Sequence, residues 1–95
     1  MRLEITQAAR SDMFALQNTG ILQFGQAQSD VFLDGLTQLF KTIARFPHMA
    51  RERIEYTPPV RIHPYRSLVV VYRIETDHVK VMRVLHGRQD LRRIL

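Results

Sequence analysis

The 95-residue sequence contains no cysteine, so neither a disulfide framework nor a thiolate zinc site can form. Its amino-terminal stretch lacks the apolar run of a signal peptide, and no segment is long and apolar enough to span a bilayer. We therefore expect a cytoplasmic protein with no membrane contact. A chain of this length predicts a single domain over residues 1–95, with a small core.

Side chains that carry common reaction chemistries are also sparse. The four glycines form no phosphate-binding loop, and the three serines lie in no nucleophile setting. The four histidines show no metal-ligand spacing, although His86 could serve as a general base or as a hydrogen-bonded structural group. We expect no cofactor, no bound metal, and neither hydrolase nor nucleotide-dependent chemistry.

Lysine is rare, because only Lys41 and Lys80 accompany twelve arginines. The net charge is +5, and it is segregated: from Arg45 onward eleven basic residues face five acidic ones, whereas residues 1–44 hold three and four. The arginine fork suits carboxylates, phosphates and guanine edges. The second half therefore predicts a basic surface for nucleic acid, for an acidic protein segment, or simply for solvent.

Hydrophobic spacing divides the first half of the chain into a short strand and two helices. Residues 2–6 alternate polar and apolar, and Thr6 is a suitable N-cap for a helix that stops near Gly25. Asp12 lies early in that helix, where a carboxylate favours the helix dipole. The second helix, residues 26–46, carries an apolar stripe of Phe32, Leu36, Leu39, Ile43 and Phe46. The short link predicts an antiparallel helical hairpin.

The second half reads as a loop over residues 47–59 followed by strands. A strand at residues 60–63 precedes a β-hairpin over residues 65–88, whose strands are rich in valine, isoleucine and tyrosine. The predicted fold class is α+β: a strand, a helical hairpin, then a three-stranded antiparallel sheet. We expect both helices on one face of that sheet, which leaves the other face to solvent or a partner.

The register of the β-hairpin follows from its polar turn, Glu75-Thr76-Asp77-His78. With the tip at residues 76 and 77, one face is nearly all apolar and is predicted to be the core face; its expected pairs are Ile74–Val79, Tyr72–Val81, Val70–Arg83 and Leu68–Leu85. The other face is part basic and part apolar, with Arg73–Lys80, Val71–Met82 and Val69–Val84. Like charges opposite each other are unfavourable in a ladder, so we expect that face to meet a partner.

Arginine 83 interrupts the expected core face, and a buried guanidinium must be paired. We expect an ion pair with Asp90 or Glu75. Arg66 and Arg88 lie at neighbouring strand ends in this register, where they could frame one anion site or remain solvated.

The run from Tyr65-Arg66 through Tyr72-Arg73-Ile74 to Arg83–Asp90 resembles the carboxy-terminal half of ParE toxins, a branch of the RelE/ParE superfamily. The segment RVLHGRQD is the most specific part, and the order of elements is similar over nearly the whole chain. The resemblance implies the RelE/ParE-like toxin fold and the toxin of a type II toxin–antitoxin system. It further implies a non-enzyme that inhibits DNA gyrase by binding, is neutralised by a ParD-like antitoxin, and meets nucleic acid only through the gyrase–DNA complex.

Seven residues of the basic half are assigned by this hypothesis to target or antitoxin binding: Arg61, Arg66, Arg73, Lys80, Arg83, His86 and Arg88. The alternative is a RelE-like, ribosome-dependent mRNA interferase, in which Arg66, Arg88 and His86 would be catalytic. That family pattern also has two lysines on the strand before Tyr65 and a tyrosine in the tail, and residues 59–63 and 91–95 supply neither. An inactive remnant or a plain interaction module is the third hypothesis.

Overall fold

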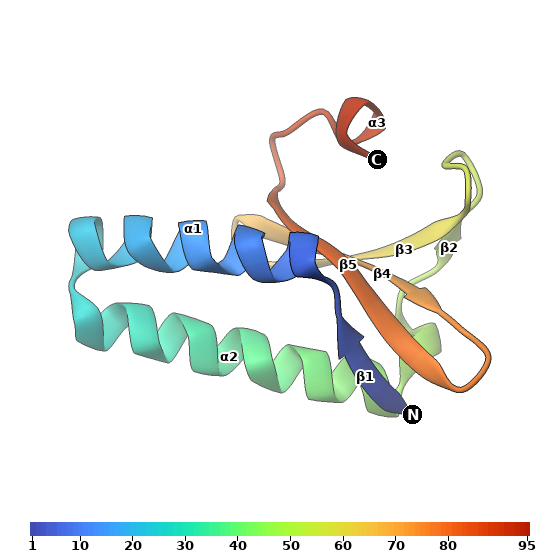
Figure 1. Cartoon of the computed structure of the whole chain (residues 1–95), viewed down its shortest axis with the longest axis horizontal. Coiled ribbons are helices and arrows are strands. Elements are labelled where there is room, and N and C mark those ends of the chain that lie inside the picture. The colour runs from blue at the N-terminus through green and yellow to red at the C-terminus, as the bar shows by residue number, and fades with distance from the viewer.

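A five-stranded sheet carries a helical hairpin in the computed structural model of this chain (Figure 1). The structure describes the backbone of residues 1–95 and all side chains except those of residues 21 and 22. Its elements, in chain order, are β1 (Arg2–Ile5), α1 (Gln7–Phe24), α2 (Gln26–Arg45), the 3-10 turn η1 (Pro47–Met49), β2 (Glu52–Arg53), β3 (Val60–Tyr65), β4 (Leu68–Ile74), β5 (His78–His86) and α3 (Leu91–Ile94).

The α+β class and the order of the main elements are as predicted, but the sheet is larger than expected. Its strand order is β1-β5-β4-β3-β2. The amino-terminal strand β1 joins as a parallel partner of β5 rather than standing apart. The two-residue strand β2 lies in the stretch predicted to be loop and pairs with β3. Two residues are too few for any alternating pattern, so the sequence could not indicate this strand.

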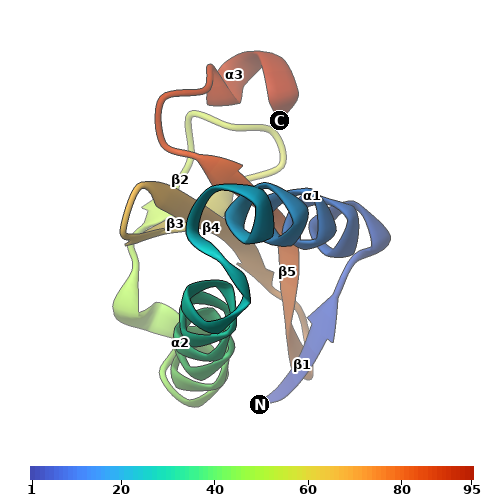
Figure 2. The ribbon, with the colours of Figure 1, turned by 90° about the vertical axis from the view of Figure 1, so that its left-hand side faces the viewer.

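The helical hairpin begins and turns where the sequence predicted. The Ala9 amide donates a hydrogen bond of 3.1 Å to Thr6 Oγ1, so Thr6 caps α1. Gly25, the one residue between the helices, has a φ of 83°, which a residue without a side chain adopts at little cost. Figure 2 shows α1 and α2 end-on, side by side. In both ribbon views α3 lies on the opposite side of the sheet from α2.

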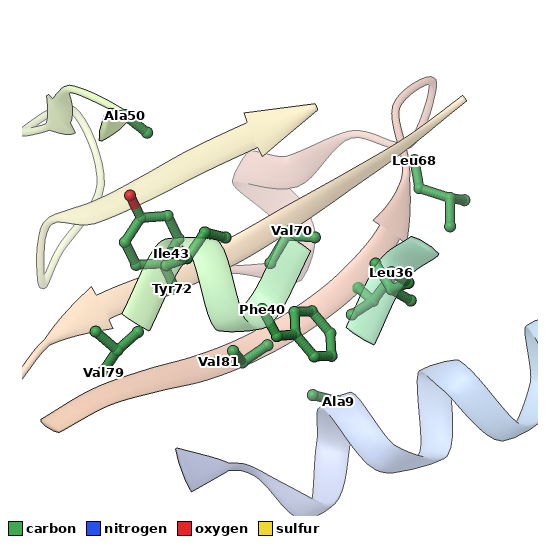
Figure 3. Packing of buried hydrophobic residues seen from close by; sticks show 11 residues of the cluster. Ala9, Leu36, Phe40, Ile43, Ala50, Leu68, Val70, Tyr72, Val79 and Val81 are labelled. Carbon is green, nitrogen blue, oxygen red and sulfur yellow. The ribbon is translucent and has the colours of Figure 1, made fainter. Parts of the chain in front are cut away.

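The core lies between the helical hairpin and one face of β4 and β5 (Figure 3). Alternate strand residues face it, as the period of two requires. The largest fully buried side chains of this core are Tyr72, Phe40, Leu36, Ile43, Val70, Val79, Val81 and Val84. Of the predicted α2 stripe, Leu36 and Ile43 are buried, whereas Phe46 is 56% exposed because α2 ends one residue before it.

A β-bulge changes the predicted pairing of β4 with β5. The three expected pairs nearest the turn, Ile74–Val79, Arg73–Lys80 and Tyr72–Val81, are confirmed. Beyond them Met82 has no partner in the ladder, and each remaining prediction is wrong by one residue. The observed pairs are Val71–Arg83, Val70–Val84, Val69–Leu85 and Leu68–His86.

The bulge keeps the Arg83 guanidinium off the core face of the sheet. An unshifted ladder would have placed a guanidinium opposite Val70 in the core, and an uncompensated buried charge is strongly destabilising. One extra residue in β5 places Val84 there instead, with 1% of its surface exposed. No helix in the described part of the chain combines the length and apolarity needed to cross a membrane.

Candidate functional site

A groove of about 830 Å³ opens where the linked ends of α1 and α2 approach the turn between β3 and β4. We call it the hairpin groove. Its described lining consists of Leu16, Thr19, Gly20, Gln23, Phe24, Ala27, Gln28, Ser29, Val31, Phe32, Arg66, Ser67, Leu68 and His86. Phe24 and Val31 are 65% and 63% exposed, so this groove presents large apolar side chains to solvent.

Arg66 lies at the β-turn end of the groove in an unusual backbone conformation. Its φ is 54°, in the left-handed region that costs a non-glycine residue about 1–3 kcal/mol. The guanidinium carbon lies 5.6 Å from the ring centroid of Phe32 and 5.7 Å from that of Tyr65, within cation–π range. The two rings pack edge to face at 5.3 Å, so Arg66 rests on a preformed aromatic platform.

The platform is fixed to α2 by a hydrogen bond and by a close approach of the backbone. The Tyr65 hydroxyl donates to the Phe32 carbonyl at 2.9 Å. A Cβ atom on Gly35 would overlap that hydroxyl, so any larger residue at this helical position would have to displace the Tyr65 ring. The ring beneath Arg66 is therefore held in one position by the second helix.

His86, at the end of β5, lines the same groove, whereas Arg88 is not among its lining residues. The His86 amide donates to Gln89 Oε1 at 2.9 Å, and the Gly87 amide donates to the Ser67 carbonyl at 2.8 Å. The observed register pairs His86 with Leu68, next to the turn that holds Arg66. The structure thus places Arg66 and His86 on one groove, and Arg88 follows in the turn whose Gly87 amide bonds the Ser67 carbonyl, one residue from Arg66.

Arg83 forms the ion pair expected of it, but both predicted partners are wrong. Its Nε donates to Asp12 Oδ2 at 2.8 Å and its Nη2 donates to Asp12 Oδ1 at 2.9 Å. The Val84 amide also donates to Asp12 Oδ2, at 3.0 Å. These bonds raise the pKa of Arg83, chiefly through the hydrogen bond to Asp12. Asp12 thus joins α1 to the bulged part of β5, 71 residues away.

Arg61 is likewise bonded within the chain. Its Nη1 donates to the Ala50 carbonyl at 2.6 Å, and the neighbouring Tyr72 hydroxyl donates to the Pro47 carbonyl at 2.8 Å. Arg61 pairs with Tyr72 in the β3–β4 ladder, so the two bonds act side by side. Together they hold the segment that follows α2 against the sheet.

Arg73 and Lys80 lie directly opposite each other on the face turned away from the helical hairpin, as predicted. Arg73 forms an ion pair of 3.2 Å with Glu75, which offsets the repulsion between the two cations. The apolar part of this face is less open than expected, because Val71 is fully buried and Leu85 is 4% exposed. A basic strip therefore remains available there, but not a broad apolar one.

A cluster of charged side chains that the sequence did not indicate lies at the amino-terminal end of β5. The His78 ring bonds Asp77 at 2.8 Å through Nδ1 and Glu4 at 2.9 Å through Nε2. Arg2 donates to Asp77 at 2.7 Å. Hydrogen bonds to the two carboxylates raise the pKa of His78, and the bond to Asp77 has the largest effect. His78 and Arg2 in turn lower the pKa of Asp77. The cluster depends on the parallel β1–β5 pairing, which no local pattern predicts.

Comparison with known proteins gives consistent results. A family model described as the ParE toxin of the type II toxin–antitoxin system parDE matches residues 3–91. Toxin ParE3 of Caulobacter vibrioides is 29% identical over 59 residues, which are 62% of this chain and 59% of that toxin's length. A chain from a solved structure of the chromosomal ParDE TA system from P. aeruginosa has a TM-score of 0.79 at 16% identity, covering 90% of this chain and 95% of that one. This last likeness is one of fold.

Proposed function

This chain belongs to the ParE toxin family of type II toxin–antitoxin systems, and on that premise we propose that it inhibits DNA gyrase by binding and that a ParD-like antitoxin neutralises it. The single observation that carries the proposal is the family match over residues 3–91, nearly the whole chain. The relative from P. aeruginosa belongs to a ParDE system, which supports an antitoxin as the partner.

The composition of the groove supports binding rather than catalysis. Metal-free RNA cleavage needs one group to take the proton from the 2′-hydroxyl and another to protonate the leaving oxygen. Among the described lining residues, His86 is the only histidine, and no aspartate, glutamate, lysine or tyrosine accompanies it. Strand β3 holds no lysine and the tail from residue 91 holds no tyrosine, so the other groups of the RelE-type set are missing from the sequence.

The surfaces described above suit a binding protein. Arg66 and His86 lie on the hairpin groove, Arg73 and Lys80 on the opposite sheet face, and Arg88 in the turn after β5; all five remain proposed contacts of the target or antitoxin. Arg61 and Arg83 are hydrogen-bonded within the chain. We therefore propose that they stabilise the binding surface and add to its positive charge without contacting the partner. A net charge of +5 would speed capture of an acidic antitoxin.

The second candidate is a RelE-like, ribosome-dependent mRNA interferase, favoured by the shared position of Arg66 and His86 on one groove. Two reactions separate the candidates: purified protein is added to a gyrase supercoiling reaction and to a coupled translation reaction. Loss of supercoiling with intact transcripts is the result we expect. Transcripts cut on ribosomes, with the cut abolished by Arg66→Ala, would establish the interferase instead. No effect in either reaction would favour an inactive remnant or a plain interaction module.

A further inference from the structure

The segment that follows β5, residues 87–95, carries three arginines whose charges no carboxylate of the described chain neutralises. Arg88, Arg92 and Arg93 are exposed, and their guanidinium groups form no ion pair with any described residue. The one acidic residue of the segment, Asp90, accepts a hydrogen bond of 3.2 Å from the Arg92 amide and so caps α3. We call residues 87–95 the basic arm.

Most arginines on or beside the strands differ from those of the arm, because carboxylates of the chain accompany them. The observed pairs are Arg2–Asp77, Arg53–Glu55, Arg73–Glu75 and Arg83–Asp12. Lys80 stands opposite Glu4 in the β1–β5 ladder. Charges of both signs are thus mixed near the amino-terminal end of β5, whereas positive charge prevails where β5 passes into the basic arm.

Hydrogen bonds between backbone groups give the basic arm a defined shape. The Gly87 amide donates to the Ser67 carbonyl at 2.8 Å, and the Gln89 amide donates to the His86 carbonyl at 3.0 Å. The first bond ties the start of the arm to the β3–β4 turn. Groups that are already ordered lose less conformational entropy on binding, so the arm presents its charges at a low entropic cost.

The exposed surface of the basic arm is cationic rather than apolar. Leu91 and Ile94 lie three residues apart on one side of α3 and are half-buried. Among the large apolar side chains that are exposed in the described chain, Leu95 alone belongs to the arm, and it is 37% exposed. Tight protein interfaces depend on large buried anchors, whereas binding along a phosphate backbone depends on cations. The arm therefore fits a polyanion better than a protein surface.

We propose that the basic arm contacts the phosphate backbone of the duplex DNA held by gyrase, with Arg88, Arg92 and Arg93 as the phosphate-binding residues. This inference rests on the proposed function, because a toxin that binds gyrase during its reaction meets the DNA of that enzyme. The planar fork of arginine matches phosphate oxygens. Phosphate contacts carry no sequence information, so the arm binds duplexes of different sequence alike.

The test measures binding of the purified full-length chain to a short labelled DNA duplex by fluorescence anisotropy, over a range of salt concentrations. The unmodified chain should bind with a Kd of about 1–100 μM at physiological salt, and log K should fall linearly with log salt. The arm variant, Arg92→Gln with Arg93→Gln, should bind about 10- to 30-fold more weakly and reduce that slope by about 2. It should also require about 10-fold more protein to inhibit supercoiling.

The matched control is Lys41→Gln with Arg45→Gln, which removes the same two charges from exposed positions of α2. Helix α2 lies on the opposite side of the sheet from α3 (Figures 1 and 2). The control should change the Kd for DNA less than about twofold, because charges far from the contact are screened. Both double variants alter exposed side chains, so their melting temperatures should stay close to that of the unmodified chain.

The DNA contact and the proposed function fail in different ways. If the chain inhibits gyrase but the arm variant binds DNA and inhibits gyrase as well as the control does, the arm assignment is wrong and the gyrase function stands. If the chain binds DNA through the arm and leaves supercoiling intact, the proposed function is wrong and the DNA contact stands. Loss of inhibition in the arm variant, from a chain that binds no DNA, would place the arm on the gyrase protein instead. Tighter binding of a single-stranded RNA of equal length would overturn the choice of DNA.

Discussion

The bond network around Asp12 yields the sharpest prediction about stability. Asp12→Ala removes three hydrogen bonds, two from the Arg83 guanidinium and one from the Val84 amide. The side chains of Asp12 and Arg83 are 13% and 30% exposed, so the pair is neither a surface pair nor a fully buried one. Removing one partner costs up to about 1 kcal/mol at the surface and about 3–5 kcal/mol in the interior. We therefore expect a loss of about 2 kcal/mol in the free energy of unfolding.

Urea unfolding measures this loss, and thermal unfolding should show a fall in Tm of roughly 10 °C for a domain of this size. Asp34→Ala is the matched control, because Asp34 is exposed in α2 and the same gain in helix propensity applies. We expect the control to change stability by less than about 0.5 kcal/mol. Arg83→Met combined with Asp12→Ala should cost less than the sum of the single changes. An Asp12→Ala variant as stable as the Asp34→Ala control would refute the reasoning.

Three further predictions concern the platform, the charged cluster and the basic strip. Gly35→Ala should destabilise the chain by about 1–3 kcal/mol in urea unfolding, because the new methyl group displaces Tyr65. This loss should exceed the gain from the better helix propensity of alanine. An unchanged urea midpoint would argue against the close contact. The pKa of His78 is raised by two carboxylates, so its contribution to stability is complete below about pH 6.5 and disappears as pH rises through the folded-state pKa. Tm measured from pH 5 to 9 should fall more for the unmodified chain than for His78→Gln, and parallel curves would contradict this. Arg73→Glu combined with Lys80→Glu should weaken antitoxin binding and make it less sensitive to salt. Unchanged affinity in a salt titration would remove this strip from the interface.

The parts of the fold that local signals encode could be predicted from the sequence. A glycine and a cap at Thr6 delimit the first helix, Pro47 follows the second, and the valine-rich strands flank a polar turn at residues 75–78. Each of these signals acts within a few residues, so one sequence is enough to interpret it. The pairing of Arg73 with Lys80 was also predictable, because these residues lie between the turn and the bulge, where the register counted from the turn still holds.

The remaining features depend on contacts between residues that are distant in the chain. The bulge at Met82 is favoured because Arg83 reaches Asp12 on another element, and no local pattern indicates that partner. One inserted residue then pairs His86, rather than Leu85, with Leu68 at the edge of the turn that holds Arg66. The arrangement of Arg66 on two rings also requires the packing of α2 against β3, which the sequence alone does not specify. That the seven basic residues contact a target or antitoxin stays a prediction; the structure adds that Arg61 and Arg83 are hydrogen-bonded within the chain.

We propose that this toxin acts by binding to gyrase and that its antitoxin prevents that binding. The most direct measurement is the supercoiling activity of purified gyrase with increasing amounts of the chain, alone and after preincubation with its cognate antitoxin. We expect supercoiling to be lost in a dose-dependent way and restored by one equivalent or more of antitoxin. Full supercoiling at every dose, from a chain that is folded and binds its antitoxin, would contradict the account.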